Sequence, residues 1–434
     1  MIKTCAVKRN MTTNNLQRAD LNKFDRLLNA LSQVNPLKEA SYQWSVLDHE
    51  LNRYFSELAQ LNSTRELHRS SLYRELEEEI LAVLNGIQTG VFAPPVREYS
   101  PTIRATAWNI ERGIQLEGIV EAFRKDRVLR RSDILFLTEV DYGMARSRNL
   151  NVAREIAERL ELNFAFAPSY INLSKGSGLE NRVAGKNRQA LHGNALLSRY
   201  PLRNVRSVVL PNGKDKMRGK EKRLGSQRAV VAVVEHPSGP LQAVCVHLDA
   251  HSTQKHRMRQ MRLILDELDA FDEQMPALIG GDWNTSTYNS RNAFFSIVGY
   301  ARRVLMGINN ILHNHYPHPD RWFERHLFRE LERRGFNYRD LNEPGACTLH
   351  YDVNDLAANG RMADWIPNWC FWFINWALER NGGRCSMKLD WFAGRGVFPS
   401  PDFPPRVVTG LHPEIPLSDH DPIVLDFTLA GRPR

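Results

Sequence analysis

The stretch ALIGGDWN, residues 277–284, leads from an apolar segment through two glycines to a carboxylate and a carboxamide. A short run of Ala, Leu and Ile is typical of a strand that is covered on both faces. Polar side chains at the end of such a strand, here Asp282 and Asn284, either shape a turn or contact a ligand. Taken alone the stretch favours the turn, so the rest of the chain has to decide between the two interpretations.

The same pattern recurs from about residue 100 onwards. Short apolar segments, which we interpret as strands, alternate with amphipathic segments that predict helices at 151–162 and 252–271. Several of the predicted strands end in polar residues: Asn109 and Glu111, Glu139 and Asp141, His247 and Asp249, and Asp282 and Asn284. One polar strand end indicates a turn, whereas several together indicate a shared site at one edge of layered sheets.

Composition limits the kind of protein this is. A chain of 434 residues predicts two units. The 58 Lys and Arg outnumber the 49 Asp and Glu, and the net charge of +9 favours a polyanionic partner such as nucleic acid, or an anionic membrane surface. The five cysteines are scattered and form no CxxC pair, which is typical of reduced thiols. Neither a secretory signal nor a run of ~20 apolar residues is present, so we expect a soluble or at most peripheral protein of the cytoplasm.

The first part of the chain has a different pattern. Apolar residues at three- and four-residue steps over 44–61 predict a helix. The sequence STRE, 63–66, then predicts a capping box of Ser63 and Glu66 that begins a second helix. We therefore expect an N-terminal helical region over residues 1–97, which docks against a second domain over residues 98–434.

The polar strand ends suggest a chemistry. Carboxylate and carboxamide oxygens suit Mg²⁺ or Mn²⁺ better than zinc, and neutral Asn and His donors suit phosphoryl oxygens. Two further stretches add to the set: KLDWFAGRG supplies Asp390, and LSDHDPIVLDF supplies Asp419 and His420 just before a predicted strand. A second Asp is well suited to orient the imidazole of such a His. The combination predicts metal-assisted hydrolysis of a phosphate ester.

Seven motifs occur in the order seen in one known superfamily: WNIERG, LFLTEVD, HGNALLSRYPL, VHLDAHS, GGDWN, KLDWF and SDHDP. Over roughly residues 100–430 the chain resembles the endonuclease/exonuclease/phosphatase superfamily, which has the deoxyribonuclease I-like fold. This resemblance implies a four-layer α/β sandwich of two mixed sheets flanked by helices, to which the N-terminal helical region is an appendage.

The resemblance also implies a metal site. Asn109 and Glu139 would hold Mg²⁺ or Mn²⁺, Asp419 is a further candidate ligand, and Glu111 would reach the ion through water. This chain has Thr138 where the superfamily more often has Gln before the metal-binding Glu. That departure speaks against the abasic-site endonuclease and deadenylase branches and leaves the ligand itself in place.

Catalytic roles follow from the same resemblance. Asp282 would orient or deprotonate the attacking water, and Asn284 would bind a phosphoryl oxygen. His420, oriented by Asp390, would stabilise the transition state or transfer a proton. His247 would contact the scissile phosphate.

Two segments leave alternatives open. The loop over 211–223 has six Lys or Arg and two acids, which indicates either a solvated charge run or a loop that steers phosphates. A long insertion over about 286–385 contains four Trp between 365 and 376 at helical spacing. Burial against the second domain is the favoured interpretation, and docking on a lipid surface or in a partner's groove is the alternative. The scarcity of Lys and Arg on its polar face disfavours a membrane.

We therefore predict a Mg²⁺-dependent phosphoesterase that hydrolyses a phosphodiester, with DNA or RNA as the first choice of substrate. A phospholipid or small-phosphoester hydrolase is one alternative. A binding module that keeps the fold without catalysis is the other.

Overall fold

The computed structural model describes residues 47–96, 98–177, 180–285, 298–299, 302–303, 305–352, 382–411 and 416–429. The chain divides into two compact units, Met1–Trp44 and Ser45–Arg434, and the described helices and strands all belong to the second. The predicted Trp-rich helix at 365–376 and part of the predicted insertion lie outside the described residues.

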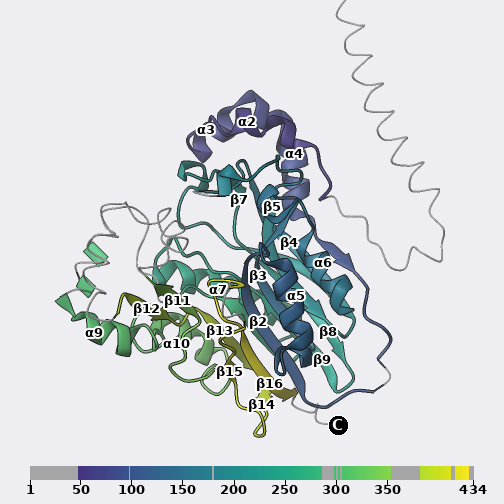
Figure 1. Ribbon diagram of the computed structural model, residues 1–434, viewed down its shortest axis with the longest axis vertical. Helices are drawn as coiled ribbons and strands as arrows, with labels where there is room; N and C mark the ends of the chain where they lie inside the picture. The colour runs from purple at the N-terminus through teal and green to yellow at the C-terminus, as the bar shows by residue number, and fades with distance from the viewer. Residues whose placement is uncertain are drawn as a thin grey trace, which may run out of the picture. The chain divides into compact units, whose positions relative to one another are not determined.

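Two mixed sheets form the centre of the second unit (Figure 1). The nine-stranded sheet has the order β1-β4-β5-β3-β2-β16-β14, with β15 on β16 and β7 on β4. Its strands are β1 (Gln88–Gly90), β2 (Ile103–Arg112), β3 (Ile134–Tyr142), β4 (Asn163–Asn172), β5 (Leu191–Ser198), β7 (Arg223–Gly225), β14 (Val397–Pro399), β15 (Arg406–Val407) and β16 (Ile423–Leu429).

The five-stranded sheet has the order β13-β10-β9-β8-β6. Its strands are β6 (Leu202–Val209), β8 (Arg228–His236), β9 (Gly239–Cys245), β10 (Ala277–Asp282) and β13 (Asp390–Arg395). A separate pair joins β11 (Leu349–Asp352) to β12 (Arg384–Met387). The stretch ALIGGDWN therefore contains β10, which has the neighbours β9 and β13 on its two sides, as expected for a buried strand.

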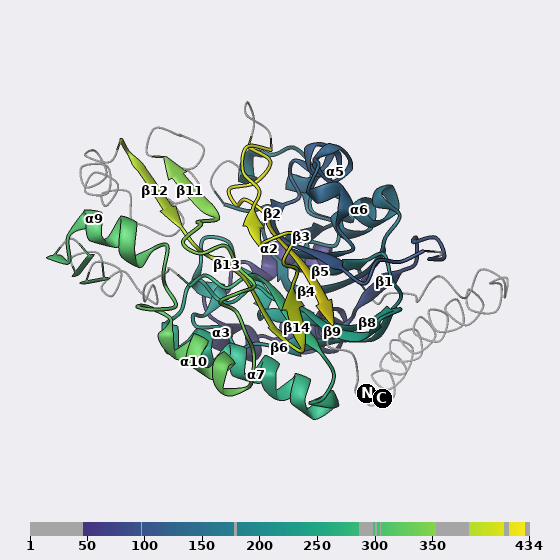
Figure 2. The ribbon, with the colours of Figure 1, turned by 90° about the horizontal axis from the view of Figure 1, so that it is seen from below.

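Helices cover the outer faces of both sheets, which confirms the predicted four-layer sandwich. Figure 2 shows α5 (Leu116–Lys125) and α6 (Val152–Leu160) on one side, and α7 (Gln254–Asp272) and α10 (Arg325–Arg333) on the other. Successive side chains of a strand point to opposite faces of its sheet, so each strand contributes residues both to the core between the sheets and to the layer beneath the helices. On β10, Leu278 enters the core between the sheets, whereas Ile279 packs beneath α7 and α10. No helix in the described ranges has the length and apolar character to cross a membrane.

The described helices before residue 86 are η2 (Leu51–Tyr54), α2 (Phe55–Leu58), α3 (Thr64–Arg69) and α4 (Ser71–Asn85). Ser63 caps α3 as predicted, because its hydroxyl accepts from the backbone N–H of Glu66 at 3.1 Å. The expected second helix is in fact two, since the hydroxyl of Ser70 accepts from the N–H of Tyr73 and starts α4. The apolar faces of these helices join the core that covers the nine-stranded sheet. The domain boundary near residue 97 stays a prediction.

Strand β4 was not predicted, although it lies inside the large sheet. Its sequence NFAFAPSYIN contains Pro168, and a proline argues against an internal strand because it lacks a backbone N–H. The register between β4 and β5 shifts between Pro168 and Tyr170. This irregularity accommodates the proline within the sheet.

Gly281 on β10 offers a test of how closely this strand packs against its neighbours in both sheets. Its φ is +135°, and a Cβ there would lie 2.2 Å from the carbonyl oxygen of Val246 and 3.2 Å from Thr138 on the other sheet. We expect Gly281→Ala to lower the free energy of unfolding by roughly 2–5 kcal/mol, from backbone strain and overpacking, as measured by urea denaturation. Gly239→Ala is the matched control, because Gly239 has φ +139° and nothing within 4 Å of the added Cβ. Equal losses in the two variants would contradict close packing at Gly281.

Candidate active site

The sequence-predicted site residues lie at one edge of the two sheets. Parallel pairing of β2 with β3, and of β9 with β10, brings the carboxyl ends of these strands to the same edge. The antiparallel strands β13 and β16 begin there, so that the polar residues at their starts join the others. The edge therefore carries Asn109, Glu111, Glu139, His247, Asp282, Asn284, Asp390, Asp419 and His420.

The backbone at this edge is unusual in four places. Glu111, Arg112, Glu139 and Asn284 have φ of 45°, 66°, 53° and 52°, in the left-handed region that side chains disfavour. The pairing of β2 with β3 also shifts register between Asn109 and Arg112, as does that of β3 with β5 near Glu139. Such irregularities redirect side chains and gather at functional sites.

Asp282 is the centre of the arrangement and is 2% exposed. One of its carboxylate oxygens, Oδ2, lies 3.4 Å from Nε2 of His247 and 3.9 Å from Nε2 of His420, and accepts a hydrogen bond from Nδ2 of Asn109 at 3.2 Å. The other oxygen accepts the backbone N–H of Asn284 at 2.9 Å. Asn109 comes from the large sheet and Asp282 from the small one, so this group holds the two sheets together.

His420 is fixed between two carboxylates. Its Nδ1 lies 2.7 Å from Oδ2 of Asp390, and its Nε2 faces Asp282. Asp390 is in turn held by the hydroxyl of Thr348, which donates to the same oxygen at 2.6 Å. Thr348 belongs to the insertion, and no motif in the sequence pointed to it.

The pKa values of Asp282 and His420 are both raised, but for different reasons. Burial raises the pKa of Asp282, and the nearby His247 and His420 only partly offset this. Burial lowers the pKa of His420, but Asp390 and Asp282 outweigh it and hold that pKa well above its usual value. The raised pKa makes Asp282 a better base than a free carboxylate, and the neighbouring carboxylates favour the protonated form of His420.

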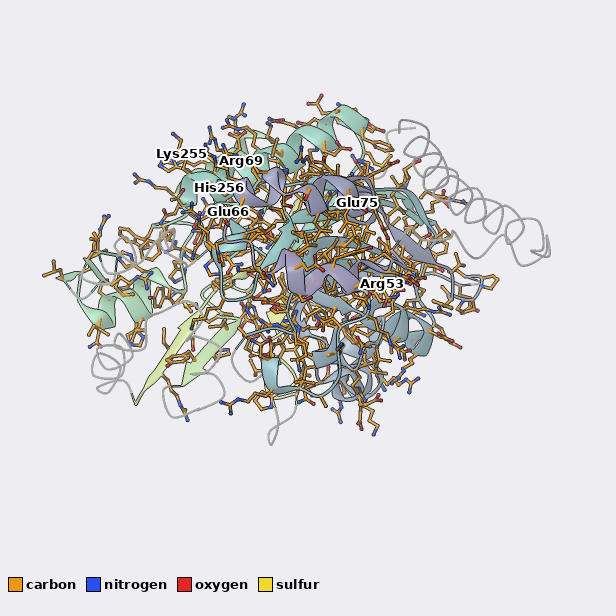
Figure 3. The ribbon with its side chains drawn as sticks, turned by 90° about the horizontal axis from the view of Figure 1, so that it is seen from above. Arg53, Glu66, Arg69, Glu75, Lys255 and His256 are labelled. Carbon is orange, nitrogen blue, oxygen red and sulfur yellow. The ribbon has the colours of Figure 1, made fainter. Side chains whose placement is uncertain are left out.

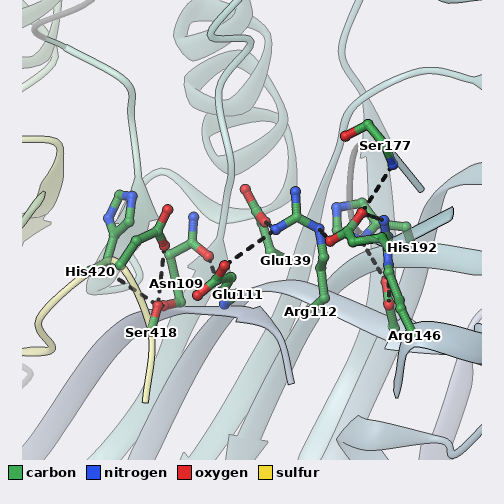
Figure 4. A network of polar contacts seen from close by, with 12 residues as sticks. Asn109, Glu111, Arg112, Glu139, Arg146, Ser177, His192, Ser418 and His420 are labelled. Atoms are coloured by element: carbon green, nitrogen blue, oxygen red, sulfur yellow. Dashed lines mark hydrogen bonds and ion pairs between the residues drawn. The ribbon is translucent and has the colours of Figure 1, made fainter. Parts of the chain in front are cut away.

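Arg112 is a residue that the sequence analysis did not single out. Its Nη1 lies 3.5 Å from Oε2 of Glu139 and 3.9 Å from Oε1 of Glu111, and its Nε lies 3.1 Å from Oε1 of Glu180. Figure 4 shows its guanidinium between the Glu111–Glu139 pair and the neighbouring Arg146 group. Burial raises the pKa of Glu139, but the charges of Arg112 and of the nearby histidines together outweigh burial and lower that pKa. Its place within the WNIERG motif was the signal that could have identified it.

A second polar network lies beside Arg112. Arg146 is buried and donates to both carboxylate oxygens of Asp141, at 2.7 and 3.0 Å, and its Nη1 lies 3.1 Å from both Glu180 and Glu221. His192 places its Nδ1 2.8 Å from Asp141. The network is connected through Glu180 to Arg112, and so to the predicted metal ligand Glu139.

The donor set fits a hard divalent cation. Glu139 and Glu111 offer carboxylate oxygens beside Asn109, and these are the ligand atoms that Mg²⁺ and Mn²⁺ prefer. Asp419 follows Ser418, whose hydroxyl donates to the carbonyl of Asn109 at 2.6 Å.

Among the described residues, Asp282, Asp390 and His420 also present donor atoms within 4.8 Å of one another. We interpret this second group as proton-transfer machinery, because both ring nitrogens of His420 already face carboxylates.

The model of the Endonuclease/Exonuclease/phosphatase family matches residues 106–420. No curated protein shows significant sequence similarity to the chain.

Similar solved structures include an endonuclease/exonuclease/phosphatase from Beutenbergia cavernae DSM 12333 (17% identity, TM-score 0.46, covering 76% of this chain and 72% of that one). A family protein from Leptotrichia buccalis C-1013-b (11%, TM-score 0.43, 75% and 100%) and a 3'-5' exonuclease from Neisseria meningitidis (14%, TM-score 0.42, 75% and 100%) are also similar.

The raised pKa of His420 can be measured directly. We expect Asp390→Asn to lower it, because burial opposes the imidazolium and Asp390 makes the largest opposing contribution. In the variant the proton should then leave His420 at a lower pH than in the parent. An NMR titration of histidine-labelled, metal-free protein checks this. Thr348→Val is the control, since it keeps the Asp390 carboxylate and should shift the pKa less; an unchanged pKa in Asp390→Asn would contradict the interpretation.

Proposed function

The chain belongs to the endonuclease/exonuclease/phosphatase family, and from this premise we propose that it is a divalent-metal-dependent phosphoesterase that hydrolyses a phosphodiester in nucleic acid. The observation that carries the proposal is the position of Asp282. This buried carboxylate with a raised pKa faces two imidazoles and a carboxamide at one strand edge. Such a group can take a proton from water beside donors that suit a phosphoryl oxygen.

The roles of the side chains follow from their contacts. Asp282 accepts the proton of the attacking water, since its pKa is raised and its oxygens lie at the centre of the site. His420 stabilises the negative charge that grows on the phosphoryl oxygens or gives a proton to the leaving oxygen, because Asp390 keeps it protonated. The other hydrogen-bond donors for the phosphoryl oxygens are His247, Asn109 and Asn284. The side chain of Asn284 is positioned by a hydrogen bond from Nδ2 to the carbonyl of Leu248 at 3.0 Å.

Mg²⁺ or Mn²⁺ would be held by Glu139, with Asn109, Glu111 and Asp419 as further donors. When bound, the cation neutralises the phosphate and polarises it towards attack. Arg112 balances the charge of the two glutamates and holds Glu139 in place.

Nucleic acid is the preferred substrate class because of charge. The whole chain has a net charge of +9, which favours a polyanion. The loop over 211–223 supports this only in part. Lys216 pairs with Asp249 at 3.1 Å, and the ammonium of Lys222 donates to the carbonyls of Ala59 and Leu61. Much of its charge is therefore used inside the fold.

Removing either proton-transfer group should abolish most of the activity. We expect Asp282→Ala and His420→Ala to lower kcat on bis-p-nitrophenyl phosphate with Mg²⁺ or Mn²⁺ by roughly 10²–10⁴-fold. Circular dichroism and thermal unfolding should show that both variants fold. Asp402→Ala is the matched control, since Asp402 is exposed in a loop near Arg104, at the other end of β2. Full activity in either site variant would rule out the assigned role.

A substrate panel tests the substrate class. We expect EDTA-sensitive cleavage of DNA or RNA, and rates that fall steeply as salt rises, because phosphate contacts release counterions. The panel should contain single- and double-stranded DNA, abasic-site DNA, RNA, sphingomyelin and inositol phosphates, with Asp282→Ala as the blank. Turnover of only the lipid or the small esters would keep the chemistry and overturn the substrate. No turnover of any compound would support the binding module instead.

A further inference from the structure

A cavity of about 300 Å³ lies beside the first turn of α7. It is lined by Gly213 of the basic loop and by Ser252, Thr253, Lys255, His256 and Arg259 at the start of the helix. None of these residues has a role in the site described above. Lys255 and Arg259 are four residues apart and therefore project from the same face of α7. Figure 3 shows Lys255 and His256 at the start of this helix.

The walls of the cavity are fixed by hydrogen bonds. The carboxylate of Asp249 accepts the backbone N–H of Gly213 at 2.6 Å and that of His251 at 3.0 Å. The carbonyl of Pro211 accepts from Nε2 of Gln260 at 2.8 Å and lies 2.8 Å from Nε2 of His256. The loop before Gly213 is thus tied to α7, and the cavity is part of the folded structure.

The charge around the cavity is positive. Asp249 is 1% exposed and is paired with Lys216 at 3.1 Å, so its negative charge is balanced. Lys214, Lys255 and Arg259 have no side-chain hydrogen bond or ion pair with any residue in the described ranges. The first turn of the helix adds partial positive charge.

The pKa of His251 reflects this positive charge. Burial, and then the charge of Lys216, lower its pKa to about 3, with Lys214 contributing in the same direction. A neutral imidazole and unpaired cations leave the region suited to an anion.

The cavity and the catalytic site share one segment of backbone. His247 belongs to the site, Ser252 lines the cavity, and only four residues separate them. Between them, the N–H of Leu248 donates to the carbonyl of Asp282 at 2.9 Å, and its carbonyl accepts from Asn284. A polymer bound at the site can therefore reach the cavity along this segment.

We propose that the cavity binds a backbone phosphate of the nucleic-acid strand, close to the scissile phosphodiester, and that Lys255 and Arg259 supply its charged donors. The inference rests on the proposed function and identifies where the strand passes after it leaves the site. Contacts of this kind position a strand without reading its bases. Lys255 and Arg259 are positioning residues, because they touch the substrate away from the reacting atoms.

The test is the double variant Lys255→Gln/Arg259→Gln. We expect KM for a single-stranded oligonucleotide to rise about tenfold. The logarithm of the binding constant falls with the logarithm of the salt concentration, and we expect this slope to become shallower by about 0.7 for the lost phosphate contact. The effect on the oligonucleotide should exceed the effect on bis-p-nitrophenyl phosphate at least fivefold. A merely structural role would alter both substrates alike.

The matched control is Arg130→Gln/Arg131→Gln, on η3 (Leu129–Arg131) at the amino end of β3. This variant also removes two positive charges, but at the end of β3 that lies away from the active site. Neither side chain has a partner among the described residues. Equal KM values and salt slopes in the two double variants would overturn the inference and leave the proposed function intact. If the parent hydrolyses bis-p-nitrophenyl phosphate and no nucleic acid, the substrate class and this inference both fail.

Discussion

The close approach of the two sheets at Gly280 and Gly281 is the constraint on which the rest of the structure depends. A Cβ at Gly280 would lie 3.1 Å from Phe136 of the other sheet, and one at Gly281 would lie 3.2 Å from Thr138 of that sheet and 2.2 Å from the carbonyl oxygen of Val246, which follows β9. Side chains at these positions would push β10 away from β3. Two glycines let the small sheet come near enough for Asp282 to reach groups on the large one.

This approach decides the electrostatics as well. Buried carboxylates are costly unless they are paired, and here the partners come from across the gap between the sheets. Asn109 on β2 contacts Asp282, and His420 at the start of β16 contacts Asp390. Burial raises the pKa of Asp282, and the charges of Asp390 and Asp282 raise that of His420, which are the directions that acid–base chemistry needs. Stability and function at this edge therefore depend on one geometry.

The helices before residue 86 support the loop that borders the cavity. Thr64, at the start of α3, donates its hydroxyl to Asp215 at 2.6 Å, and the ammonium of Lys222 donates to carbonyls beyond the end of α2. Both contacts fall in the basic loop over 211–223. These helices thus hold, from a distance of some 150 positions in sequence, a loop that supplies Gly213 to the cavity. Charges that looked like a free basic run serve partly as structural ties.

The sequence by itself determined the strands and the polar residues at their ends, because side-chain alternation, apolar runs and turn residues are local signals. Eight of the sixteen described strands were predicted in this way, β10 with its Asp282 among them, and the order of seven motifs implied the four layers. Strand β4 was not predicted, because Pro168 contradicts the local pattern of a strand. A register shift between β4 and β5 accommodates this proline. The partners of Arg112 and the support of Asp390 by Thr348, 42 residues away, were decided by tertiary structure alone. Such contacts depend on which strand ends meet in space, and no short stretch of sequence contains that information.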